Sequence, residues 1–66
     1  MGRVSRIFPA DGYGFLTSPS GQEIYFHENS LLDADLEDLK VGTLVSFVEH
    51  EGDKGPQASS VAIAGA

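Results

Sequence analysis

Four ring-bearing side chains lie at alternate positions of two short segments of this chain, and their spacing indicates stacking chemistry. Tyr13 and Phe15 are two residues apart in the first segment, and Tyr25 and His27 are two residues apart in the second. Alternate side chains of an extended strand point to the same face, so each pair shares one face of its strand. If the two strands pair as a hairpin, all four rings gather on one surface. A surface of exposed rings fits a flat partner, and nucleic-acid bases are the commonest flat partners.

Apolar residues next to these rings fit a core. Leu16, Ile24 and Phe26 share the opposite face of the same hairpin by the same alternation. Both faces of the hairpin are therefore rich in apolar groups. The alternative interpretation is that the rings simply pack inside a barrel, because aromatic residues are enriched in strands in any case.

Turn-forming residues divide the chain into five predicted strands, two of which are the ring-bearing segments. These cover residues 2–8, 13–18, 22–27, 43–50 and 56–63. Residues 18–21 (Ser-Pro-Ser-Gly) fit a type I turn, and one helical turn is expected at residues 35–39 within the long connection 28–42. Three strands in a meander, a crossover and a closing hairpin predict an all-β, five-stranded antiparallel Greek-key barrel of the OB type. Ligands of that fold bind on strands 2 and 3, the surface that alternation alone selects.

Composition limits the classes of function. The 66 residues include no cysteine, and we predict a single domain over residues 1–66. No nucleophile-elbow or metal-ligand spacing is present. Residues 33–38 resemble the start of a calcium loop, but Asp38 replaces its glycine and Leu44 replaces its glutamate. We therefore predict no enzyme, no catalytic residue, no metal and no cofactor. Without an apolar span or signal peptide, we expect a cytoplasmic monomer with no membrane partner.

The charge of the chain argues against nucleic acid as a partner. Ten carboxylates and four basic side chains give a net charge of −6, whereas nucleic-acid-binding proteins usually carry a basic patch. Most of the carboxylates cluster in the long connection and near the last turn, where they fit a solvated face. Asp11, Glu23 and Glu28 are different, because each is adjacent to the ring-bearing segments. These three should weaken phosphate binding.

The motifs together resemble the cold-shock domain family. Residues 12–16 (Gly-Tyr-Gly-Phe-Leu) are similar to its first ribonucleoprotein motif, and residues 24–27 (Ile-Tyr-Phe-His) are similar to its second. Residues 39–47 and 54–61 fit its fourth and fifth strands. The resemblance implies a bacterial five-stranded barrel that binds single-stranded DNA or RNA and acts as an RNA chaperone.

The resemblance also implies which residues bind. It assigns stacking to the four rings, and it assigns phosphate, base-face and base-edge contacts to three residues of the last loop. In this sequence the stacking residues are Tyr13, Phe15, Tyr25 and His27, and the loop residues are Lys54, Pro56 and Gln57.

Several positions depart from the family pattern. The usual tryptophan of the first strand falls at Arg6, and the lysine before the first motif falls at Asp11. Two aromatic positions hold Glu28 and Leu36, and a basic position holds Ser5. Arg6 is a further candidate, because a guanidinium stacks on bases and attracts phosphate. Strict alternation places Arg6 on the same face as Val4, so this role requires a β-bulge in the first strand.

A second function is consistent with the acidic surface. A module that docks on a basic partner such as a ribosomal protein needs no basic border of its own. The chain begins and ends close to its first and last strands, as an excised or appended domain would. Residues 26–31 and the acidic connection resemble the cold-shock domains at the end of some bacterial ribosome-hibernation proteins. His50 lacks any comparable context, and we interpret it as a surface residue near the end of a strand.

Overall fold

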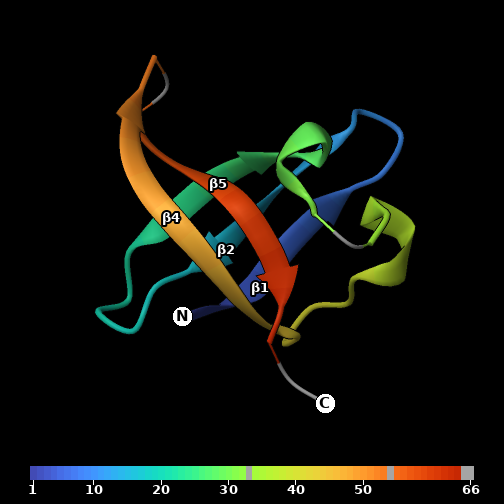
Figure 1. The fold of residues 1–66 in the computed structure, drawn as a ribbon, viewed down its shortest axis with the longest axis horizontal. Helices are drawn as coiled ribbons and strands as arrows, with labels where there is room; N and C mark the ends of the chain where they lie inside the picture. The colour runs from blue at the N-terminus through green and yellow to red at the C-terminus, as the bar shows by residue number, and fades with distance from the viewer. Residues whose placement is uncertain (33, 54, 65–66) are drawn as a thin grey trace.

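A computed structural model describes residues 1–32, 34–53 and 55–64 of the chain. Its five strands are β1 (Gly2–Phe8), β2 (Tyr13–Thr17), β3 (Glu23–His27), β4 (Leu44–Gly52) and β5 (Gly55–Ile63). They close into a barrel in the order β1-β2-β3-β5-β4, and β1 pairs with β4 to complete the ring (Figure 1). All pairs are antiparallel except β3 with β5, which run parallel. The predicted all-β, five-stranded barrel is confirmed and is consistent with the OB fold.

The core follows from alternation in the strands. Leu16, Ile24 and Phe26 have no exposed surface, as predicted for the inner face of the β2–β3 hairpin. Residues from β1, β4, β5 and the long connection complete the core, and burial of apolar surface is the main driving force for folding. The other buried residues are Val4, Leu36, Leu39, Val45, Ala58 and Val61.

Gly14 lets the core ring of Phe26 approach the backbone of β2. A Cβ at Gly14 would lie 2.7 Å from the carbonyl oxygen of Arg6 and 2.9 Å from Cζ of Phe26. Neither neighbour has room to move, because one is backbone and the other is a fully buried ring. The glycine between Tyr13 and Phe15 is therefore required by packing on the inner side of the strand that presents those rings.

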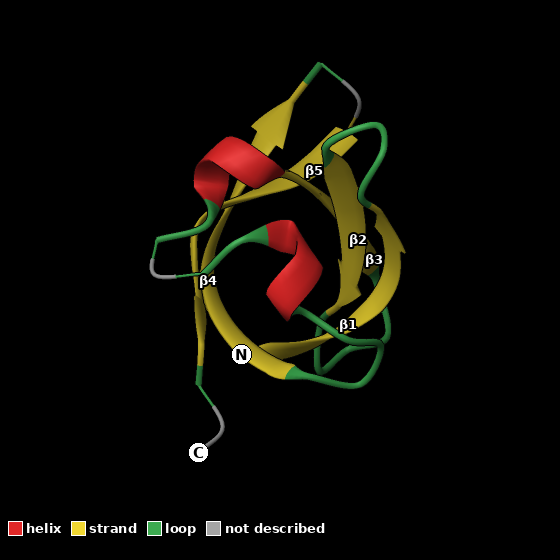
Figure 2. Cartoon of the chain, turned by 90° about the vertical axis from the view of Figure 1, so that its right-hand side faces the viewer, coloured by secondary structure: helices red, strands yellow, loops and turns green. Residues whose placement is uncertain are grey.

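The long connection covers one open end of the barrel (Figure 2). It contains two short 3₁₀ helices, η1 (Glu28–Ser30) and η2 (Leu36–Asp38). The helical turn predicted at residues 35–39 is confirmed as η2, whereas η1 was not predicted. Leu36 is the buried residue of η2. The backbone N–H of Asp35, just before η2, donates to the Asp38 carboxylate at 3.1 Å.

The turn between β2 and β3 agrees with its predicted type, whereas the β4–β5 hairpin differs from its predicted length. In the turn between β2 and β3, the N–H of Gly21 donates to the carbonyl of Ser18 at 2.9 Å. The β4–β5 hairpin is longer than expected, because pairing continues to Gly52 and Gly55. Lys54 lies outside the described residues. Among the described residues, no helix is long and apolar enough to span a membrane.

Candidate nucleic-acid interface

The β2–β3 hairpin brings the four predicted rings onto one outer face. Tyr13 pairs with His27, and Phe15 pairs with Tyr25. Directly paired residues of antiparallel strands share a face, with Cβ atoms about 4.5–5.5 Å apart. Their neighbours along each strand point into the core, so the hairpin is apolar inside and ring-bearing outside. The predicted arrangement of these four side chains is confirmed, while their role in binding stays a prediction.

A β-bulge in β1 turns Arg6 to the same outer face. Val4 pairs with Leu16, but Arg6 pairs with Phe15, so the register shifts by one residue at Ser5. The strict alternation that we applied to β1 is therefore wrong, because a bulge places two residues opposite one. Arg6 lies beside Phe15 instead of facing the core with Val4, and 62% of its side chain is exposed.

The same bulge adds a ring that sequence analysis did not assign. Phe8 pairs with Tyr13 across the strands, and the two ring centroids are 5.0 Å apart. Phe8 also contacts Phe15, with centroids 6.3 Å apart. We call the outer face of β1–β3 that carries Phe8, Tyr13, Phe15 and Tyr25 the ring face.

The rings of the ring face have two orientations. Phe8, Tyr13 and Tyr25 form a row across the three strands, with angles of 32° and 37° between successive ring planes. Phe15 lies edge-on to all three, at angles of 85°, 86° and 72°. Such tilted and edge-to-face pairs each contribute about 0.5–1.5 kcal/mol beyond surface burial, so the rings hold one another in place.

The Glu23 carboxylate partly neutralises the positive charge of Arg6 beside the rings. Oε2 of Glu23 lies 3.6 Å from Nε of Arg6 and accepts a hydrogen bond from Oγ of Ser5 at 3.3 Å. Glu23 therefore neutralises part of the charge of Arg6, and its effect on phosphate binding stays a prediction. The single hydroxyl proton of Ser5, where the family pattern has a basic residue, is shared between this carboxylate and the carbonyl oxygen of Phe15, which also lies 3.3 Å from Oγ.

The other charged groups add little positive potential to the ring face. Arg3 donates to the carbonyl of Gly42 at 3.0 Å, next to the start of β4 and away from β3. Asp11 is exposed in the turn before Tyr13. The Glu28 carboxylate lies against Gly12, where an added Cβ would be 3.2–3.3 Å from its atoms. The acidic border predicted from sequence therefore surrounds this end of the ring face.

His27 is held by the start of the long connection. Its Nδ1 accepts a hydrogen bond from the backbone N–H of Asn29 at 3.1 Å, which caps η1. The N–H of Glu28 donates to the carbonyl of Gly12 at 2.9 Å. With Nδ1 used as an acceptor, the proton of the neutral imidazole lies on Nε2, which is a donor for a base edge or a phosphate.

A small cavity lies between His27 and strand β5. It has a volume of about 130 Å³ and is lined by Tyr25, His27, Ser30, His50, Gln57 and Ala58. Gln57 pairs with Tyr25 in the parallel β3–β5 contact, and its side chain lies against Gly52. His50, which we interpreted as a surface residue alone, is exposed but also borders this cavity. Pro56 pairs with Glu51 nearer the hairpin tip.

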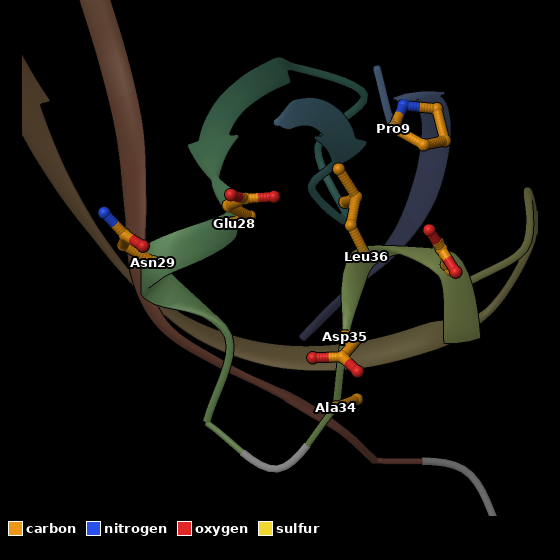
Figure 3. A pocket seen from close by; sticks show the side chains of 7 residues that line it. Pro9, Glu28, Asn29, Ala34, Asp35 and Leu36 are labelled. Carbon is orange, nitrogen blue, oxygen red and sulfur yellow. The ribbon is translucent and has the colours of Figure 1, made fainter. Parts of the chain in front are cut away.

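A second cavity beside the barrel is acidic and lies off the ring face. It measures about 360 Å³ and is lined by Pro9, Glu28, Asn29, Ala34, Asp35, Leu36 and Glu37. Figure 3 shows Leu36 pointing from η2 toward the strands, while Glu28 and Asp35 border the opening. Its carboxylates repel phosphate. Within the described part of the chain, no group of three or more acidic, histidine or cysteine side chains could hold a metal ion.

Comparison with known proteins identifies the family of this fold and ring face. Residues 1–64 match the family described as the 'Cold-shock' DNA-binding domain. The cold shock protein CspV of Vibrio cholerae is 39% identical over 61 residues, which cover 91% of this chain and 87% of that protein. The cold shock-like protein of Thermotoga maritima is 36% identical over 62 residues, covering 94% of each chain.

A further relative agrees with this assignment. The major cold shock protein CspA of Pseudomonas aeruginosa is 37% identical over 62 residues, covering 94% of this chain and 90% of that protein. None of these three names refers to ribosome hibernation, so the narrower resemblance stays a prediction. The chain belongs to the cold-shock domain family, whose members bind nucleic acid and are not enzymes, as predicted for this chain.

Proposed function

We propose that this domain binds single-stranded RNA or DNA by stacking unpaired bases on Tyr13, Phe15 and Tyr25, with His27 at the edge. The observation that carries the proposal is a set of mutually contacting rings on an outer surface whose inner side is already a filled core. Membership of the cold-shock DNA-binding domain family supports it independently.

The arrangement of the rings suits single strands rather than duplexes. Base stacking on an aromatic ring is worth about 1–3 kcal/mol per base and tolerates any sequence, because every base has a π-face. In a duplex those faces are covered by neighbouring base pairs. The domain should therefore select unpaired segments with little preference for sequence.

The charges of the ring face imply that stacking supplies most of the affinity. Among the residues that the structure describes, Arg6 is the cation on this face, and Glu23 neutralises part of its charge. We assign Arg6 and Lys54 to phosphate contacts, Pro56 to a base face and Gln57 to a base edge. Gln57 is well placed for this, since it lies beside Tyr25 and borders the same cavity as His27.

An RNA-chaperone role follows from this mode of binding. A protein that binds unpaired bases and not paired ones lowers the free energy of the open strand and so opposes misfolded RNA pairing. The small number of cations limits electrostatic affinity, so strands should also be released readily.

Tyrosine fluorescence gives a direct test of the proposal. The chain has two tyrosines, both on the ring face, and no tryptophan. Single-stranded oligonucleotides should quench this fluorescence saturably, and the same sequence as a duplex should quench it far less. Phe15→Ala keeps both tyrosines and should weaken binding by about 1–3 kcal/mol.

A matched control separates stacking from general surface effects. Val48 is an exposed apolar residue of β4, outside the ring face, so Val48→Ala should bind as the wild type does. Absence of saturable quenching in the folded wild-type domain would contradict the proposal and favour a module that docks on protein. Equal affinity of Phe15→Ala and wild type would contradict the stacking mechanism alone.

A further inference from the structure

Phe8 is a large apolar side chain that is not part of the hydrophobic core. It ends β1 and is half-buried, yet it belongs neither to the buried core nor to the partly buried side chains that pack against the core. Its neighbour Ile7 does pack against the core. The described contacts of the Phe8 ring are those with Tyr13 and Phe15 on the outer surface.

The β1 bulge explains why Phe8 faces outward. After the register shift at Ser5, Arg6 pairs with Phe15 and Phe8 pairs with Tyr13, so both residues occupy outer positions. Ile7 lies between them and takes the inner position. Without the bulge, Phe8 would share the inner face with Val4, and Ile7 would be exposed.

The ring planes divide the ring face into two stacking directions. A base stacked parallel to Phe15 is nearly perpendicular to Tyr13, because these two rings cross at 86°. The row of Phe8, Tyr13 and Tyr25 therefore receives a different base from the one that lies on Phe15. Phe8 is the β1 end of this row, at a centroid distance of 5.0 Å from Tyr13.

We propose that Phe8 is a base-stacking residue that adds one nucleotide position to the ring face at its β1 edge. The ligand is an unpaired nucleobase of a single strand already held on Tyr13 and Phe15, so this inference rests on the proposed function. Arg6 pairs with Phe15 and comes two residues before Phe8 on the same face, so it is adjacent to both rings. We assign its guanidinium, which is 62% exposed, to the phosphate that would join the bases on Phe15 and Phe8.

Two substitutions at Phe8 test the inference. Phe8→Leu keeps an apolar side chain but removes the π-face, whereas Phe8→Tyr keeps the ring. Affinity should be measured by tyrosine quenching for Phe8→Leu with oligonucleotides that lengthen by one nucleotide at a time. The longest strands should bind Phe8→Leu about 5-fold or more weakly than wild type, while the shortest should bind equally. Phe8→Tyr, which adds a third fluorophore, should match wild-type affinity for every length when assayed by calorimetry.

A third variant tests the inference even if Phe8→Leu does not fold. Since the chain has no tryptophan, Phe8→Trp introduces a single indole whose fluorescence can be excited selectively. A single strand should quench this indole at the same concentrations at which wild-type tyrosine fluorescence is quenched.

The outcomes distinguish this inference from the proposed function. If wild type binds but the indole of Phe8→Trp is unaffected, or if folded Phe8→Leu matches wild type at every length, the role of Phe8 is wrong and the ring face stands. If wild type binds no single strand at all, the proposed function itself fails.

Discussion

Glu23→Gln should tighten single-strand binding if phosphate contacts Arg6 as proposed, because Glu23 would then compete with phosphate for the same guanidinium. The Nε–Oε2 distance is 3.6 Å, and the two side chains are 62% and 44% exposed. An ion pair this exposed contributes at most about 1 kcal/mol to stability, so the variant should remain folded. The substitution removes one negative charge and frees the guanidinium.

The size of the gain follows from electrostatics. Two like unit charges about 6 Å apart repel by about 0.7 kcal/mol in water and about 2.8 kcal/mol at an effective dielectric constant of 20. Salt screens exposed charges, so we expect a gain of about 1 kcal/mol, which is about 5-fold in affinity. One more phosphate contact should also steepen the slope of log K against log salt by about 0.7.

The assay is oligonucleotide affinity at several salt concentrations for wild type and two variants. Glu37→Gln is the matched control, because Glu37 is an exposed glutamate on η2 and its loss changes net charge equally. Equal gains for the two variants would show that net charge alone matters. No gain for Glu23→Gln would mean that phosphate does not approach Arg6.

Three other predictions concern the core and the acidic border. Phe26→Ala should lower the free energy of unfolding by about 3–5 kcal/mol, because Phe26 is fully buried, whereas Tyr25→Ala should cost clearly less; denaturant titration compares them, and equal losses would contradict the two-faced hairpin. Gly14→Ala should cost about 1–3 kcal/mol through overpacking, and unchanged stability in the same assay would contradict the close approach of Phe26. Asp11→Lys should tighten binding and steepen the salt slope by up to about 0.7, and an unchanged slope would place the phosphate path elsewhere.

Much of the hairpin was predictable from the sequence, because strand alternation is a local rule. The two faces of β2 and β3, their register and the turn at residues 18–21 all follow from the types of neighbouring residues. The buried side chains of that hairpin were identified for the same reason.

The β1 bulge was not predicted, because it is set by packing between strands. The sequence nevertheless contained two indications of a bulge. Val4 and Ile7 are both apolar but three residues apart, so strict alternation cannot place both inside. The same alternation placed Arg6 in the core, where an unpaired charge is costly. A single bulge at Ser5 resolves both conflicts and turns Arg6 and Phe8 outward.

The cavity beside His27 could not be predicted from local patterns. It forms where β3 meets β5 in parallel, which brings His50 and Gln57 beside a histidine that is distant in the sequence. Leu36 is a similar case. The family pattern has an aromatic residue at this position, and the packing of η2 at the end of the barrel buries Leu36.

The most direct measurement of the central claim is an NMR titration of the domain with a short single strand, followed residue by residue. We expect aromatic signals of Phe8, Tyr13, Phe15 and Tyr25 to shift together and to saturate at one equivalent. Signals of exposed apolar residues elsewhere, such as Leu32 and Val48, should stay unchanged. Saturable shifts that avoid the ring face, or that centre on the acidic cavity, would contradict base stacking on the ring face.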